Sequence, residues 1–217
     1  MRLATTLKRA AMRRLKDKIW LQLIVIYTRY LIGGAFVFAS IIKIKGQRFT
    51  SKSGAAEPIN SAFHFFETMY ASGLYWIFLG LGQLLAGFLL MTQRYSKLGD
   101  LGNLPIILNV FVITISYSFG LTPIIVALML LANIGLIVWE WDELKSLIIL
   151  PFLRKAKTIE NYPIWEITGY FLFAFTFVYR ILIDQYDSFF WMLICFLIGI
   201  AGLIFGLKQI RSVEFKS

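Results

Sequence analysis

A single arginine, Arg29, stands inside a stretch of the chain that is otherwise apolar. Residues 19–42 lie between Lys18 and Lys43 and include no other charged side chain. At about 1.5 Å of rise per residue, a helix of this length crosses a hydrocarbon core of roughly 30 Å. A charge at that depth costs from about 3 to more than 10 kcal/mol, so Arg29 needs a polar partner, a cavity or an interfacial position. We therefore take Arg29 as the first candidate for a functional site.

Helical spacing predicts that polar side chains of neighbouring segments face Arg29. Polar or small residues share one face in each of four successive segments: Arg29, Gly33, Ser40 and Lys43; Gly80, Gln83 and Gly87; Asn109 and Ser116; Asn133 and Glu140. Glycines let helices approach closely and amides bond between helices, so these faces should meet. We expect Arg29 to join the amides in one network, with Asp100 or Glu140 as neutralising carboxylates, although neither shares its depth convincingly. The network is either a ligand pocket or packing that holds the helices together while Arg29 extends toward lipid phosphates.

Aromatic residues in the outer loop 44–72 could cover such a pocket. Phe63, His64 and Phe66 follow Ser61, a residue type that often caps a helix, and we expect a short helix at the outer interface. This helix either roofs the cavity or anchors its rings among the lipid head groups.

Several chemistries are excluded by residue usage. The chain has one cysteine and one histidine, so a dithiol shuttle and a histidine-based metal site are both ruled out, and we expect no metal. Walker, dinucleotide-binding and nucleophile-elbow motifs are missing from the sequence, so self-contained catalysis is not expected. The net charge of +10 lies mostly in loops beside apolar segments, which indicates a lipid bilayer rather than nucleic acid as the partner.

Composition and hydropathy place the chain among integral membrane proteins. Hydrophobic residues make up 59% of it and the mean hydropathy is +0.72, more apolar surface than a soluble core could bury. Six segments are long and apolar enough to span a bilayer: 20–42, 73–92, 101–119, 123–139, 165–183 and 188–207. With both termini cytoplasmic, most of the 22 Lys and Arg residues fall on the inner side, as the positive-inside rule requires. We expect an all-α, polytopic membrane bundle with six transmembrane helices.

The spacing of these segments predicts a four-plus-two organisation. Residues 1–19 form a basic amphipathic cytoplasmic segment, 20–140 a four-helix bundle, 141–164 a cytoplasmic interfacial linker, and 165–217 a two-helix hairpin with a basic tail. Gly202 and Gly206 form a small-residue face in the last segment. That face packs either on the fifth segment or on a second copy of the protein, which would make a homodimer.

Residues 22–140 resemble the DoxX/DoxD-like family of bacterial integral membrane proteins, and the resemblance is carried by the first two segments. The residues that carry the resemblance are Arg29, Gly33, Phe36 and Lys43 in the first segment, and Gln83, Ala86, Gly87 and Arg94 in the second. Gln83 stands where the family has a carboxylate, which removes the obvious charge partner of Arg29, and Ser40 stands where glycine is common.

The resemblance implies a four-helix bundle in the bacterial plasma (inner) membrane. Some members of the family are small subunits of quinone-linked oxidoreductases, including thiosulfate:quinone oxidoreductase. It therefore implies a membrane subunit or quinone-binding partner of an oxidoreductase complex, with Arg29 and the amides bonding to a quinone carbonyl. Two alternatives stay open: a non-catalytic membrane scaffold or assembly factor, and a small-solute transporter.

Overall fold

The computed structural model describes residues 15–141, 143–144 and 159–214. The predicted basic segment and interfacial linker fall mostly outside these residues. The described part of the chain is all-α, with seven α-helices and one short 3₁₀-helix. These helices, with their bounds, are α2 (Ile19–Ile44), α3 (Ala62–Ala71), α4 (Leu74–Met91), α5 (Ser96–Ser116), α6 (Thr122–Trp139), η1 (Ile159–Asn161), α8 (Pro163–Leu182) and α9 (Ser188–Glu214).

Five of these helices, α2, α4, α5, α6 and α9, are long and apolar enough to cross a membrane. The chain is therefore a multi-pass membrane protein by helix length and hydropathy. Helix α8 has 20 residues but is not among the five; it carries Glu166 in its first turn and Arg180 in its last.

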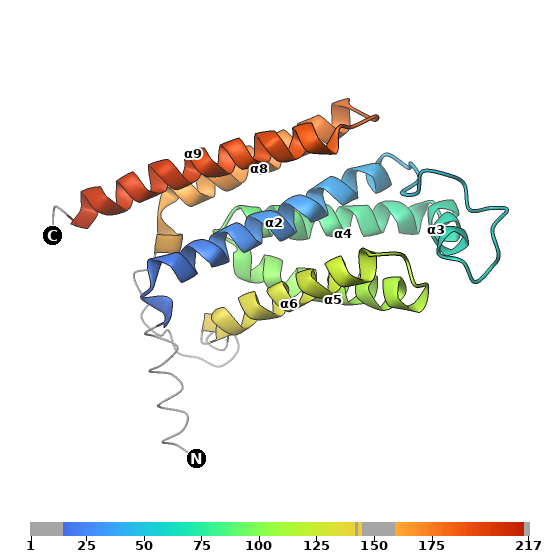
Figure 1. Ribbon diagram of the computed structural model, residues 1–217, viewed down its shortest axis with the longest axis horizontal. Coiled ribbons are helices and arrows are strands. Elements are labelled where there is room, and N and C mark those ends of the chain that lie inside the picture. The colour runs from blue at the N-terminus through green and yellow to red at the C-terminus, as the bar shows by residue number, and fades with distance from the viewer. Residues whose placement is uncertain (1–14, 142, 145–158, 215–217) are drawn as a thin grey trace, which may run out of the picture.

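Helix α2 lies at the centre of the molecule (Figure 1). It packs along α4 and, on another side, along α8, while α4 packs on α5 and α5 on α6. One hydrophobic cluster joins α2 to α4, α5 and α6 through residues such as Phe36, Leu90 and Ile107. A second cluster joins α2 to α8 and α9 through residues such as Tyr30, Trp165 and Ile210. Both groups of helices are thus built on the two faces of α2.

The helices meet closely where their contact faces carry glycine. A Cβ on Gly87 of α4 would lie 2.7 Å from the backbone oxygen of Gly33 on α2, so the two backbones are in contact there. A Cβ on Gly80 would lie 2.9 Å from Cβ of Lys43, about two turns further along the same interface. Larger residues at these positions would push α2 and α4 apart.

The glycines of α9 face α8 of the same chain. A Cβ on Gly202 would lie 2.5 Å from Oγ1 of Thr168, and one on Gly206 would lie 2.4 Å from the Trp165 ring. Of the two alternatives for this face, the structure therefore shows the internal one, helix against helix within a chain.

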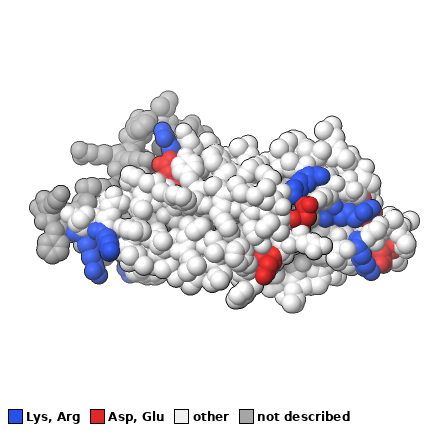
Figure 2. Space-filling view, turned by 90° about the horizontal axis from the view of Figure 1, so that it is seen from above, with Lys and Arg blue, Asp and Glu red and all other residues white. Residues whose placement is uncertain are grey.

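The exterior suits a bilayer. In Figure 2, one group of charged side chains lies toward one end of the molecule and a second group extends from about the middle to the other end, with an uncharged region between the two groups. Large apolar side chains such as Leu31, Phe78, Leu131 and Phe171 are exposed on the helices. We name the end where α2 begins the inner end and the opposite end the outer end, after the predicted orientation.

Candidate functional sites

Most of the predicted polar residues fall into two separate groups instead of one network. Arg29, Asn133 and Glu140 lie at the inner end. Gln83 lies about one turn from Gly80, which packs against Lys43, and Gln83 and Lys43 line the same cavity toward the outer end. Arg29 and Lys43 are 14 positions apart in sequence, which is about 21 Å along a helix. The expectation that Arg29 bonds to the Gln83 amide is therefore wrong, because the two side chains leave α2 and α4 at different depths.

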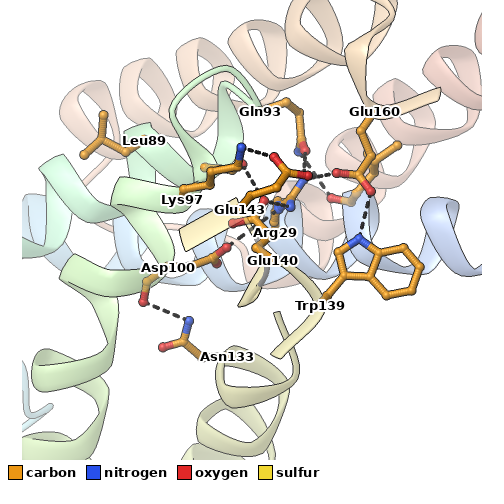
Figure 3. Close-up of polar contacts among 12 residues, drawn as sticks. Arg29, Leu89, Gln93, Lys97, Asp100, Asn133, Trp139, Glu140, Glu143 and Glu160 are labelled. Carbon is orange, nitrogen blue, oxygen red and sulfur yellow. Dashed lines mark hydrogen bonds and ion pairs between the residues drawn. The ribbon is translucent and has the colours of Figure 1, made fainter. Parts of the chain in front are cut away.

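Arg29 is buried, with 1% of its surface exposed, and its guanidinium contacts four side chains (Figure 3). Nη1 donates to Oε1 of Gln93 at 2.9 Å and to Oε2 of Glu160 at 3.2 Å. Nη2 donates to Oε1 of Glu140, and Nε lies 3.9 Å from Oδ2 of Asp100. We call Arg29, Gln93, Asp100, Glu140 and Glu160 the Arg29 cluster.

The four partners of Arg29 converge on it from four separate places in the chain. Gln93 lies in the α4–α5 turn with a φ of 57°, a left-handed conformation that is uncommon for a residue with a side chain. Asp100 lies in the second turn of α5, Glu140 caps the end of α6, and Glu160 lies in η1. Carboxyl groups thus surround Arg29 from three elements, two of them buried and that of Glu160 partly exposed.

The sequence pattern points to Asp100 and Glu140 as neutralising acids but places neither at the depth of Arg29. Helix α5 begins at Ser96 and not near residue 101, so Asp100 is inside the bundle, where its side chain is fully buried. Gln93 and Glu160 were missed. No helical spacing could have found them, because Gln93 is in a turn and Glu160 in a three-residue helix.

A further set of polar residues supports the cluster. Asn133 Nδ2 donates to the backbone oxygen of Asp100 at 3.2 Å, and Trp139 Nε1 donates to Oε1 of Glu160 at 3.0 Å. Ser96 Oγ donates to Glu140 at 3.4 Å. Burial raises the pKa of Glu140 above its usual range, and the positive charge of Arg29 opposes that shift.

A cavity of about 250 Å³ lies beside the cluster at the inner end. Its lining includes Glu140 and Glu160 of the cluster, together with Lys97, which pairs with Glu143, and Glu166 of α8. The cluster therefore has a polar path to the inner surface.

The second group lines a cavity of about 240 Å³ toward the outer end, which we call the outer cavity. Its lining comes from α2, α3, α4, α5 and α6 and is mostly apolar; it includes Phe36, Phe49, Phe66, Trp76, Ile107 and Val126. Lys43, Gln83 and Asn109 are polar exceptions.

Lys43 is 6% exposed and sits between aromatic rings. Its Nζ donates to the backbone oxygen of Ala39 at 2.8 Å and lies 5.1 Å and 5.2 Å from the centres of the Phe49 and Trp76 rings. In the described residues, no carboxylate lies within ion-pair distance of Lys43. Gln83 is 5% exposed, and its Oε1 has no hydrogen-bond partner there.

The roof of the outer cavity is built in part by α3. Phe66 lines the cavity and packs against Phe119, with ring centres 5.3 Å apart. Phe63 also packs against Phe119, with ring centres 5.9 Å apart, but does not line the cavity. His64 is also absent from the lining, and its backbone N–H is capped by Ser61 Oγ at 3.2 Å.

An ion pair between Arg48 and Glu67 ties α3 to the loop that precedes it. Arg48 Nε and Nη2 donate to both oxygens of Glu67 at 2.8 to 3.0 Å, and the Gly54 N–H donates to Oε2 at 3.1 Å. The bonds from Arg48 hold the pKa of Glu67 below its usual range. The Ser40 and Ser116 hydroxyls belong to neither group, because each donates within its own helix, to Val37 and Val112.

Neither group is arranged to hold a metal ion: the described residues include no cluster of three or more metal-binding side chains of suitable geometry. Comparisons with protein-family models, curated proteins and solved structures find no match for this chain.

Proposed function

We propose that this chain is a DoxX-like membrane bundle that binds a quinone in the outer cavity, as the membrane subunit or quinone-binding partner of an oxidoreductase complex. We place it in the bacterial plasma (inner) membrane with both termini cytoplasmic and with α8 as a sixth span beside α9. The observation that carries the proposal is the buried Lys43 ammonium, which faces an apolar cavity and has no acidic partner among the described residues.

The polar groups of the outer cavity suit the two redox forms of a quinone. The Lys43 ammonium can donate to a quinone carbonyl, and such a bond is strong where water is excluded. The Gln83 amide offers both a donor and an acceptor, so it can bond to a carbonyl or to the hydroxyl of a hydroquinone. A bound quinone would supply an electron acceptor to the complex, while these two side chains hold its oxygen atoms.

The size of the outer cavity suits a ring and not a whole isoprenoid lipid. Its volume of about 240 Å³ is below the roughly 300–1,000 Å³ of pockets that enclose drug-sized ligands. Trp76, Phe49 and Phe66 provide aromatic faces for a planar ring. Asn109 lines the cavity and is also exposed on α5, so it marks a place where an apolar tail could leave toward lipid.

Quinone retention after purification tests the proposal. The full chain is extracted in mild detergent, and its lipids and co-purifying proteins are identified by mass spectrometry. We expect about one quinone per chain in the wild type and loss of most of it in Lys43→Met, which keeps the length of the side chain and removes its charge.

Lys45→Met is the matched control, because Lys45 lies two residues further on and forms an ion pair with Asp184 at 2.6 Å near the surface. It should retain quinone like the wild type. Absence of quinone from the wild type, or equal retention in the two variants, would overturn the proposal. Protein partners that co-purify without quinone would support the scaffold or assembly-factor alternative.

A further inference from the structure

The Arg29 cluster holds more acid than base. One guanidinium contacts three carboxyl groups, from Asp100, Glu140 and Glu160. Asp100 is fully buried and the Glu140 side chain is 4% exposed, so water does not screen their charges. If all three acids were ionised, the contact set would carry an excess of two negative charges, which is costly at this depth.

Neighbouring residues do not supply the missing positive charge. The titratable side chains around the cluster, taken element by element, are Lys16 before α2, Tyr30 on α2, Arg94 in the α4–α5 turn, Lys97 on α5, Glu143 after α6, Tyr162 before α8 and Glu166 on α8. Lys97 lines the same cavity as Glu140, and its ammonium is bonded to Glu143. Arg94 is exposed and lies over the Tyr95 ring.

Several acceptor atoms in the cluster have no donor. Both oxygens of Asp100, Oε2 of Glu140 and Oδ1 of Asn133 are buried without a hydrogen-bond partner among the described residues. Asp100 and Glu140 both lie against the Arg29 guanidinium, and two ionised carboxylates cannot bond to each other because both only accept. A proton on either group makes it a donor and removes one negative charge at the same time.

A proton fits this place better than a metal ion. The described residues contain no metal-binding group of three acidic, histidine or cysteine side chains, although three acids meet at Arg29. The guanidinium occupies the position between the acids that a cation would need. The cavity of about 250 Å³ that borders Glu140 and Glu160 gives a proton a route to the inner surface.

We propose that Asp100 and Glu140 form a proton-binding site that exchanges with the inner aqueous phase. The pair carries one proton when the acids at the surface of the protein are ionised, and releases it in alkaline solution. Arg29 holds the remaining negative charge of the site. The site is independent of the outer cavity, so it can be present whether or not the protein binds quinone.

Infrared difference spectroscopy of the full chain in lipid vesicles tests this site. Spectra are recorded at neutral and alkaline pH, and the C=O stretch of a protonated carboxylic acid is identified by its shift in heavy water. We expect this band in the wild type at neutral pH and its loss on alkalisation. Asp100→Asn and Glu140→Gln should each lack the band, because the remaining acid of the pair is then ionised beside a neutral amide. For the same reason, both variants should fold.

Asp184→Asn is the control, because Asp184 is an exposed acid at the outer end and should not alter the band. Absence of the band from the wild type at every pH would overturn the proposal, as would its persistence in both cluster variants. Thermal stabilisation of the wild type by sodium ions at fixed pH, lost in Asp100→Asn, would show that a cation and not a proton occupies the site.

Discussion

Replacing Arg29 by methionine should destabilise the protein strongly at neutral pH. Methionine fills much of the same volume but cannot donate, so Gln93, Glu140 and Glu160 each lose a hydrogen bond. More important, the buried carboxyl groups lose the only cation in contact with them within the described residues. Removing one partner of a buried ion pair costs about 3–5 kcal/mol, since the remaining charge stays buried and uncompensated.

This loss corresponds to a change of about 100- to 4,000-fold in the unfolding equilibrium. It should shrink as the pH is lowered, because the variant can neutralise its acids by taking up protons that the wild type does not need. Burial raises the pKa of Glu140, so Glu140 takes up a proton at a higher pH than an ordinary glutamate does. Arg29→Met and the wild type should therefore differ least in mildly acidic solution.

Unfolding in mixed micelles by titration with sodium dodecyl sulfate, followed by far-ultraviolet circular dichroism, measures the difference. Arg94→Met is a matched control at the same end of the bundle, because Arg94 is exposed and should change stability by less than about 1 kcal/mol. The combination Arg29→Met, Asp100→Asn and Glu140→Gln should recover most of the lost stability. If Arg29→Met alone unfolds at the same detergent fraction as the wild type, the account of Arg29 as the charge that stabilises the cluster is incorrect.

Three further predictions concern other parts of the fold. Gly87→Leu should cost at least about 1–3 kcal/mol, because a Cβ there meets the backbone of α2, whereas Gly102→Leu, which has open space, should be tolerated in the same unfolding assay. The pKa of Glu67 is lowered, so its ion pair with Arg48 stabilises the outer loop at pH values above the usual pKa range of a carboxyl group. This stabilisation is lost as the pH falls through the lowered pKa, and proteolysis of the loop should increase at that pH. Arg48→Gln should remove most of the pH dependence. Cys195 should not form a disulfide-linked dimer in oxidised native membranes, since its Sγ lies 3.8 Å from Oγ1 of a threonine on α8, and an efficient crosslink would show that this face meets a second copy.

The positions of the long helices could be predicted from the sequence. The apolar segments predict all five of α2, α4, α5, α6 and α9, since the hydrophobic pattern alone determines which stretches can be buried in lipid. The bounds of α2, α4 and α6 agree within a few residues, whereas α5 begins earlier and α9 ends later than predicted. The pairing of Gly33 with Gly87 follows the same logic, because small residues at helical spacing indicate close helix contact. Such patterns depend only on the spacing of apolar and small residues, which can be counted directly in the sequence.

The partners of Arg29 could not be predicted in the same way. The start of α5 was placed about five residues too late, because Lys97 and Asp100 resemble an interfacial loop in hydropathy. That error put Asp100 outside the bundle. Gln93 and Glu160 reach Arg29 from a turn and a 3₁₀-helix, whose positions are set by tertiary packing and leave no periodic signal in the sequence.

Arg29 and Lys43 are buried cations on the same helix, but their surroundings differ. This difference distinguishes a structural role from a ligand-binding role. Arg29 contacts three carboxyl groups, whereas Lys43 contacts two aromatic rings and one backbone oxygen. Removing Arg29 leaves buried negative charge without a cation, which is destabilising. Removing Lys43 takes away a desolvated positive charge that the described residues do not neutralise, which is not. Lys43→Met should therefore keep or raise the stability of the ligand-free protein while it weakens ligand binding. Stability and retention measured on the same two variants then assign each cation its role without knowledge of the physiological ligand.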